Sequence, residues 1–285
     1  MRKLMEYKIV SGRTVEIRRS WFPVGPEYRQ PRGNRRASAS SEKKIRANEK
    51  ESARTLARVI NCNFEAGDMF LTLKYDEAHY PAAGKGMKHD DRIEVEYQTC
   101  RQLLAKKYLP KLRREYLKQT GKKLRAVWVT ANWSTSYQRL ADRVHHHMVI
   151  PADAVELARK LWRRIGGAGT MWLEDLNAEG DYSRLAAYML DNVHNRPAGE
   201  RKWACSREME RPFIVEMREV SDVEDVQPVP EAVIKDVEQV RDEDGRTTSA
   251  YLRCTLPARP KVRGNMLILP RKKTRRRRAP SDESL

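Results

Sequence analysis

Cysteine is scarce in this sequence, and the few thiols are scattered. The chain of 285 residues contains only Cys62, Cys100, Cys205 and Cys254, with no CxxC pair among them. Zinc ribbons and disulfide-stapled domains need closely spaced or abundant cysteines, so the sequence argues against both classes. Isolated thiols suit a reducing compartment, and we therefore expect a cytoplasmic protein.

Long apolar runs are also missing. No stretch approaches the roughly 20 apolar residues of a membrane-spanning helix. The basic pair Arg2-Lys3 is not followed by the apolar run of a secretory signal. Charged residues make up 34% of the chain, so we expect a polar protein with neither a secretory signal nor a membrane partner.

Positive charge is present in excess. Lys and Arg number 57 against 39 Asp and Glu, a formal net charge of +18 at neutral pH. Residues 1–60 hold sixteen of these cations and six acids, and residues 271–278 hold seven cations. Such an excess calls for a polyanionic partner, and nucleic acid is the first candidate. For the basic run alone, the alternative is a solvated tail that binds nothing.

The charge pattern also suggests how the chain is organised. Segment 29–36 is basic and rich in Pro and Gly, which is typical of a flexible arm. Residues 221–245 hold nine acids and two bases, which predicts a solvated linker. We therefore expect a basic flexible N-terminal arm, a folded domain, an acidic linker and a basic flexible C-terminal tail, over residues 1–41, 42–215, 216–250 and 251–285.

The middle of the chain alternates between strand and helix patterns. Apolar periodicity, Gly and Pro predict, in chain order, a helix, a strand, a long helix interrupted by Pro110, two strands, a helix, a strand and a helix, over residues 42–60, 69–75, 92–118, 125–130, 143–150, 151–165, 169–174 and 181–194. The order β-α-β-β-α-β predicts an α+β protein with a split βαβ, ferredoxin-like antiparallel sheet and helices packed on one face of it.

Three of the six histidines are adjacent, at the entry of the second of these paired strands. Side chains alternate along a strand, so His145 and His147 share one face, with Cα atoms about 6.5–7 Å apart, and His146 points to the other. Two such imidazoles can share one divalent ion. Imidazole alone suits Zn, Cu or Ni, whereas Mg²⁺ or Mn²⁺ needs further oxygen ligands. The alternative is a set of surface histidines.

The last predicted helix carries two tyrosines. Helical spacing places Arg184 and Tyr188 on one face, while Leu185 and Met189 point inward. Tyr182 lies six residues before Tyr188, which turns it about 120° away around the helix. A tyrosine in such a helix serves either in packing or as a reactive phenol, and the periodicity alone leaves both open.

Three segments in this order resemble the motifs of a known family. They are the strand FLTLKY at 70–75, the histidine strand HHHMVI at 145–150 and the helix LAAYMLDN at 185–192. Together they resemble the HUH endonuclease superfamily, and more narrowly the rolling-circle replication initiators of the phage gene II/ORF2 kind. The segment at 202–212 is similar to the stretch that comes after the tyrosine helix in that family.

The resemblance implies roles for particular residues. His145 and His147 would hold Mg²⁺ or Mn²⁺, and Tyr188 would be the nucleophile that forms a 5′-phosphotyrosine. Family members usually have a lysine one turn after the tyrosine, where this chain has Asp191; Arg184 is the candidate replacement. The family's third, carboxylate ligand has no acidic counterpart at residues 130–132, which leaves Asn132, Asp142, Asp181 or water as candidates.

The expected function follows from these roles. We expect a metal-dependent enzyme that nicks and rejoins single-stranded or hairpin origin DNA to initiate rolling-circle replication, alongside the replication machinery of a bacterial host cell. The DNA-binding cations would be Arg184, Arg275, Arg276, Arg277 and Arg278. The alternatives are a transposase or relaxase with the same core, and a basic DNA-binding protein without enzymatic activity.

Overall fold

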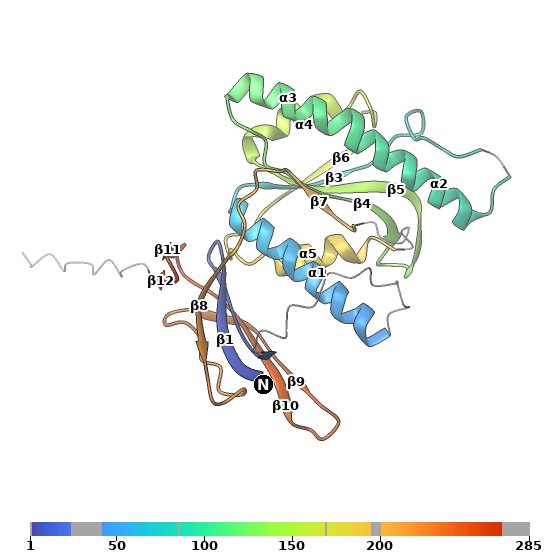
Figure 1. The fold of residues 1–285 in the computed structure, drawn as a ribbon. Helices are drawn as coiled ribbons and strands as arrows, with labels where there is room; N and C mark the ends of the chain where they lie inside the picture. The colour runs from blue at the N-terminus through green and yellow to red at the C-terminus, as the bar shows by residue number, and fades with distance from the viewer. Residues whose placement is uncertain (1, 24–41, 85, 169, 195–200, 270–285) are drawn as a thin grey trace, which may run out of the picture.

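The computed structural model describes residues 2–23, 42–84, 86–168, 170–194 and 201–269. These residues form an α+β protein with two five-stranded antiparallel sheets and a small separate hairpin (Figure 1). The basic segment 29–36 and the basic run 271–278, which the sequence predicts to be flexible, lie outside the described residues.

The first sheet has the strand order β6-β3-β5-β4-β7, and every neighbouring pair is antiparallel. Its register places Thr72 of β3 opposite His147 of β5, and His147 opposite Val129 of β4. Four strands overlap the predicted ones, with bounds β3 Met69–Leu73, β4 Val127–Ser134, β5 Arg139–Ile150 and β6 Met171–Asp175. Both β4 and β5 extend beyond their predicted ranges, and the short strand β7, Ala204–Cys205, was not predicted.

Helices cover both faces of this sheet (Figure 1), so the prediction of helices on one face is wrong. The strands explain this, because adjacent residues such as Phe70 and Leu71 point to opposite faces and both are buried. One face packs under α2 (His89–Gln102), α3 (Leu109–Thr120) and α4 (Val155–Trp162), and the other under α1 (Glu42–Asn63) and α5 (Ser183–Asp191).

The long predicted helix at residues 92–118 is continuous across its proline. A π-helical stretch, Leu103–Tyr108, joins α2 to α3, and Pro110 lies in the first turn of α3. The π-helical stretch accommodates the proline, because it shifts the hydrogen-bond register just before Pro110, where the N–H of Leu109 bonds to the carbonyl of Leu104. Gly121 ends the helix with a φ of 70°, a left-handed conformation that glycine adopts without a Cβ clash.

The second sheet corrects the predicted arm, linker and tail. Its strand order is β8-β1-β2-β10-β9. Residues 2–23, in the predicted arm, form a hairpin in this sheet. Residues 216–250, the predicted linker, contribute most of β8, all of β9 and the start of β10. Residues 251–268, in the predicted tail, include the rest of β10 and a further hairpin, β11–β12. The bounds are β1 Arg2–Ser11, β2 Thr14–Pro23, β8 Phe213–Glu219, β9 Val233–Arg241, β10 Thr247–Thr255, β11 Lys261–Arg263 and β12 Met266–Ile268.

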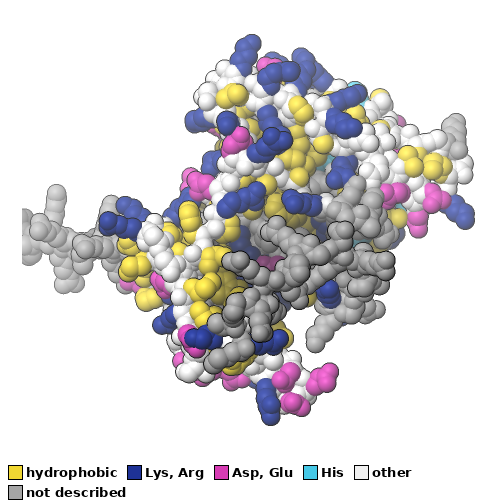
Figure 2. Space-filling view, in the orientation of Figure 1, with side chains coloured by type: hydrophobic (Ala, Val, Ile, Leu, Met, Phe, Trp, Pro, Cys, Tyr) yellow, Lys and Arg dark blue, Asp and Glu magenta, His cyan; other side chains and the backbone are white. Residues whose placement is uncertain are grey.

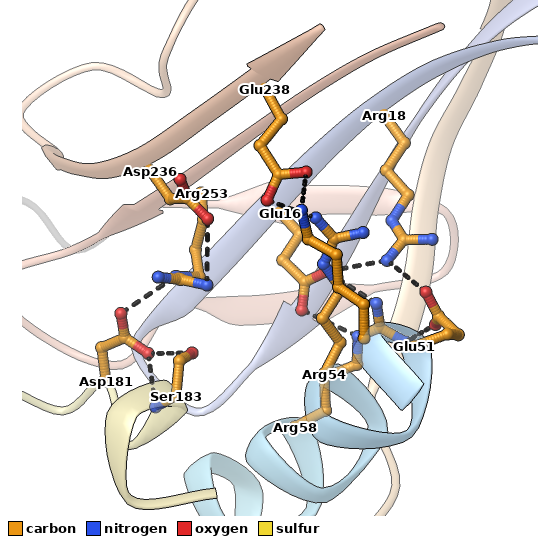
Figure 3. Close-up of polar contacts among 11 residues, drawn as sticks. Glu16, Arg18, Glu51, Arg54, Arg58, Asp181, Ser183, Asp236, Glu238 and Arg253 are labelled. Carbon is orange, nitrogen blue, oxygen red and sulfur yellow. Dashed lines mark hydrogen bonds and ion pairs between the residues drawn. The ribbon is translucent and has the colours of Figure 1, made fainter. Parts of the chain in front are cut away.

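Ion pairs explain why charge alone misled the prediction for these segments. Glu16 on β2 is buried and accepts two hydrogen bonds from Arg58 of α1, both at 2.7 Å (Figure 3). Arg18 and Arg58 also pair with Glu51, while Arg54 pairs with Glu238 of β9. These cations therefore join the second sheet to α1 and are paired within the protein.

Candidate active site

The strand β5 brings His145 and His147 together on the face covered by α1 and α5. Their ring centroids are 4.9 Å apart, with the rings perpendicular. His147 is fully buried, and its Nδ1 lies 3.1 Å from the hydroxyl of Thr72 on β3. The other nitrogen, Nε2, is buried and has no hydrogen-bond partner among the described residues. A buried, unpartnered imidazole nitrogen is unusual, because such atoms are normally satisfied.

Both imidazoles are neutral near pH 7. Burial lowers the pKa of His145 to about 4, and the charge of Lys74 acts in the same direction. Burial lowers the pKa of His147 well below its usual value, with further contributions from the neighbouring histidines and Lys74. A neutral imidazole keeps the lone pair that a metal ligand requires.

His146 points to the opposite face, as the alternation predicts. It is fully buried, and its Nε2 lies 2.8 Å from the hydroxyl of Tyr75, while its Nδ1 lies 3.1 Å from the hydroxyl of Thr130. Trp162 packs edge-on against its ring. Burial lowers the pKa of His146 to about 3. This histidine therefore belongs to the core under α2–α4 and is separated by the sheet from His145 and His147.

The helix α5 places Tyr188 directly over the histidine pair. Its ring centroid lies 5.3 Å from that of His147 and 6.1 Å from that of Phe70. The residue is 44% exposed, and it lines the same cleft as His145 and His147. Burial of the rest of the ring, and the negative charge of Glu174, raise the pKa of Tyr188 above its usual value. At neutral pH the group is a phenol, which needs activation to act as a nucleophile.

Tyr182 is not part of this arrangement. It directly precedes α5, it is buried, and its hydroxyl donates to the backbone carbonyl of Asn177 at 3.0 Å. Burial raises the pKa of Tyr182 to about 12. Its backbone N–H donates to the side-chain oxygen of Asn61 on α1. Tyr182 therefore anchors the start of α5, whereas Tyr188 is the tyrosine beside the histidines.

A cleft of about 590 Å³ opens in front of His145, His147 and Tyr188. Its lining also includes Lys74, Trp172 and Glu174, which were not among the sequence candidates. The ammonium group of Lys74 lies 4.6 Å from the ring centroid of Trp172. Strand alternation is the signal that points to them. Lys74 lies on the same face of the sheet as Thr72, two residues earlier in the chain, and Trp172 and Glu174 likewise share one face of β6, where their neighbours are exposed or half-buried.

The other sequence candidates are placed less favourably. Arg184 and Asp191 are exposed on α5 and do not line the cleft. The side-chain amide of Asn132 donates to the carbonyl of His194 and accepts from its N–H, so both its ends are used. Asp142 lines the cleft but pairs with Arg139. The four arginines of the tail, Arg275, Arg276, Arg277 and Arg278, lie outside the described residues.

Asp181, the last candidate for a third ligand, has a structural role instead. One of its oxygens accepts hydrogen bonds from the N–H and hydroxyl of Ser183, in the first turn of α5 (Figure 3). The other oxygen lies 3.0 Å from Arg253 of β10, which also pairs with Asp236 of β9. The carboxylate therefore ties the helix that carries Tyr188 to the second sheet.

The donor set fits a divalent ion held by two imidazoles. Across the described parts of the chain, no group of three or more His, Cys, Asp or Glu side chains is arranged to hold a metal. His145 and His147 nevertheless offer neutral rings, and the unpartnered Nε2 of His147 is the kind of atom that a metal satisfies. With only two protein ligands, the remaining positions would fall to water and to substrate oxygens, which suits Mg²⁺ or Mn²⁺ acting on a phosphate.

Comparisons with protein-family models, with curated proteins and with solved structures find no match to this chain. Within the described ranges, no helix is both long and apolar enough to cross a membrane. The function is therefore inferred from the chemistry of the site itself.

Proposed function

We propose that the protein nicks and rejoins single-stranded DNA through a covalent 5′-phosphotyrosine, and so initiates rolling-circle replication in the manner of HUH endonucleases. One observation carries the proposal. A pair of neutral histidines, one with an unpartnered nitrogen, lies beside an exposed tyrosine in an open cleft. Neither a structural histidine pair nor a packing tyrosine requires this arrangement.

The chemical step uses the hydroxyl oxygen of Tyr188. This oxygen attacks the scissile phosphorus and forms the new P–O bond, while the bond from phosphorus to the 3′ oxygen breaks. The phenol proton passes to solvent, and the departing 3′ oxygen takes up a proton to become a free hydroxyl. Rejoining is the reverse step, in which a 3′-hydroxyl displaces the tyrosine. It needs no ATP, because the phosphotyrosine conserves the phosphodiester bond.

Residues around Tyr188 have supporting roles in this proposal. His145 and His147 would hold a divalent ion, which polarises the phosphate and lowers its resistance to attack by an anion. The packing of Tyr188 against His147 and Phe70 fixes the direction of the phenol. Lys74 lies on the same face of the sheet. It would provide the positive charge that a lysine one turn after the tyrosine provides in the family, where this chain has Asp191.

The strand order supports the finer fold assignment within this proposal. The strands β6, β3, β5 and β4 are adjacent in that order, and helices connect β3 to β4 and β5 to β6. This order supports our proposal that the first sheet is a split βαβ, ferredoxin-like core. The origin DNA, the host replication machinery and the bacterial cytoplasm belong to the same proposal as partners and location.

A labelled oligonucleotide tests the proposal directly. The protein is incubated with a pool of random single strands labelled at the 3′ end, in Mg²⁺, Mn²⁺ or EDTA, and resolved on a denaturing gel. We expect a metal-dependent adduct that keeps the 3′ label, because a 5′-phosphotyrosine retains the downstream fragment. The Tyr188→Phe variant should bind the same strands and form no adduct. Binding without any adduct from the wild-type protein would instead indicate a non-enzymatic DNA-binding protein.

A further inference from the structure

A second concave surface lies at the β7 edge of the first sheet. It is a groove of about 480 Å³ between α2, β4 and residues 201–211. Its described lining contains no Asp or Glu. It does contain five cations and two tryptophans, namely Arg101, Arg201, Lys202, Arg207, Arg211, Trp128 and Trp203. We call this surface the edge groove.

The edge groove passes from one face of the sheet to the other. Trp128 packs against the core under α2–α4, whereas Trp203 packs against the core under α1 and α5. The pairing of Trp128 with Ala204 shows that β7 forms the edge strand between them. The face with Trp203 is also the face that carries Tyr188, so the groove leads away from the candidate active site around the sheet edge.

The groove and the candidate active site are neighbours across one strand pair. Val129 lines the groove, and its cross-strand partner is His147. Opposed residues in an antiparallel pair have Cβ atoms about 5 Å apart. A chain lying in the groove is therefore within a few nucleotides of the histidines.

The groove's charge is only partly compensated by the protein. Lys202 pairs with Glu49 of α1 at 2.9 Å. Arg207 and Arg211 are exposed, and Arg211 has a polar contact with the sulfur of Cys205 at 3.8 Å. On the face shown in Figure 2, Lys and Arg are spread over the half that holds the first sheet, where some Asp and Glu also lie, and further Asp and Glu gather at the lower tip, the turn between β9 and β10.

We propose that the edge groove binds single-stranded DNA, with phosphates on its arginines and bases stacked on Trp203 and Trp128. Arginines neutralise phosphates regardless of sequence, and aromatic side chains offer stacking surfaces to any unpaired base. The tryptophans favour a single strand over a duplex, because the faces of paired bases are covered by their neighbours. The proposal rests on the proposed function, since it specifies how the strand cut at Tyr188 is held.

Binding is measured without chemistry, so that the groove is tested apart from the nickase. Fluorescence anisotropy of a labelled oligothymidylate is recorded in EDTA against the Tyr188→Phe protein, over a series of salt concentrations. We expect Arg207→Gln with Arg211→Gln to weaken binding about tenfold and to reduce the slope of log affinity against log salt by about 1.4, from two lost phosphate contacts. Trp203→Leu should weaken binding about fivefold or more and leave the slope unchanged.

The matched control removes two exposed arginines from the turn just after α4, as Arg163→Gln with Arg164→Gln. It should leave affinity and slope close to those of the parent protein, and equal urea midpoints show that every variant is folded. The proposal is overturned if the groove and control variants bind alike, or if duplex DNA binds the parent as tightly as the single strand. If the wild-type protein forms the adduct but the groove variants bind normally, the groove proposal alone is refuted. If the groove variants bind weakly but the wild-type protein forms no adduct, the nickase proposal alone is refuted.

Discussion

The imidazole ring of His147 lies 5.3 Å from the phenol ring of Tyr188, although one residue comes from a central strand and the other from a helix packed on the sheet. The contact makes the histidine strand and the tyrosine helix one site. His147 is buried and neutral there, while Tyr188 is 44% exposed. Substitutions at these residues and at their neighbours should therefore have distinct effects on chemistry and on stability.

Alanine variants of the three adjacent histidines should fall into two classes. His145→Ala and His147→Ala are expected to abolish adduct formation, and His147→Ala should also lower stability, because it leaves the hydroxyl of Thr72 without its partner. His146→Ala should instead lower the free energy of unfolding by about 3 kcal/mol, because it leaves the hydroxyls of Tyr75 and Thr130 without their buried partner. Adduct assays and urea denaturation of the same preparations measure the two effects. Equal loss of activity in three equally stable variants would contradict the assignment of faces.

Tyr182 serves as the internal control for Tyr188. Tyr182→Phe removes one hydrogen bond, to the carbonyl of Asn177, and should cost about 1 kcal/mol of stability while adduct formation continues. Peptide mapping of the wild-type adduct should place the nucleotide on Tyr188. An adduct that maps to Tyr182 would leave the enzyme class intact and show that the site has been assigned to the wrong tyrosine.

Lys74 should contribute to the rate of nicking more than to binding. Lys74→Met removes the cation beside the histidines, and we expect adduct formation to slow by about ten- to a hundredfold. Lys74→Arg should restore much of the rate. The comparison is made at pH 8, where both histidines stay neutral with or without the charge of Lys74. Lys118→Met, on the exposed side of α3, is the control. If adduct formation slows as much in this variant, Lys74 has no specific role in the reaction.

Glu6 should make the protein sensitive to acid. Burial alone would raise the pKa of Glu6, but hydrogen bonds from Arg19 and Arg218 more than offset this and lower the pKa below 4.5. Below pH 4.5 the unfolded chain therefore binds a proton before the folded protein does, and stability falls as the pH falls. Glu6→Gln should cost about 3 kcal/mol at pH 7, and less at lower pH.

Urea midpoints at pH 7, 5 and 3.5 measure this effect. The difference between the wild-type and Glu6→Gln proteins should narrow toward pH 3.5. Glu115→Gln, which disturbs only a 3.5 Å pair with the exposed Arg114, should show no such trend. A gap that stays constant over the whole range would mean that Glu6 has the same pKa in the folded and unfolded chains.

The basic run at residues 271–278 should add affinity without sequence preference. Phosphate contacts carry no base information, so truncation after Pro270 is expected to flatten the dependence of log affinity on log salt. The sites at which single strands are nicked should stay the same. Sequencing the strands recovered from adducts checks this, and a changed set of sites in the truncated protein would show that the run reads sequence.

The sequence by itself determined four of the five strands of the first sheet and its histidine geometry. Its strands and helices follow apolar periodicity and Gly and Pro signals, which act over a few residues. The strict alternation of a strand was sufficient to put His145 and His147 on one face and His146 on the other. Helical spacing also predicted that Tyr182 and Tyr188 point in different directions, and the structure brings Tyr188 beside His147.

The tertiary structure decided the features that depend on contacts between distant segments. Residues 2–23 look like a basic arm because their cations are counted one by one, yet Arg19 pairs with Glu6 and β2 meets α1 through Glu16 and Arg58. From the sequence alone, Lys74 is only the polar end of a strand. The pairing of β3 with β6 in the folded protein places its ammonium group over the ring of Trp172. Charge and alternation are local properties of a sequence, whereas a partner for a charge is found only when the sheets assemble.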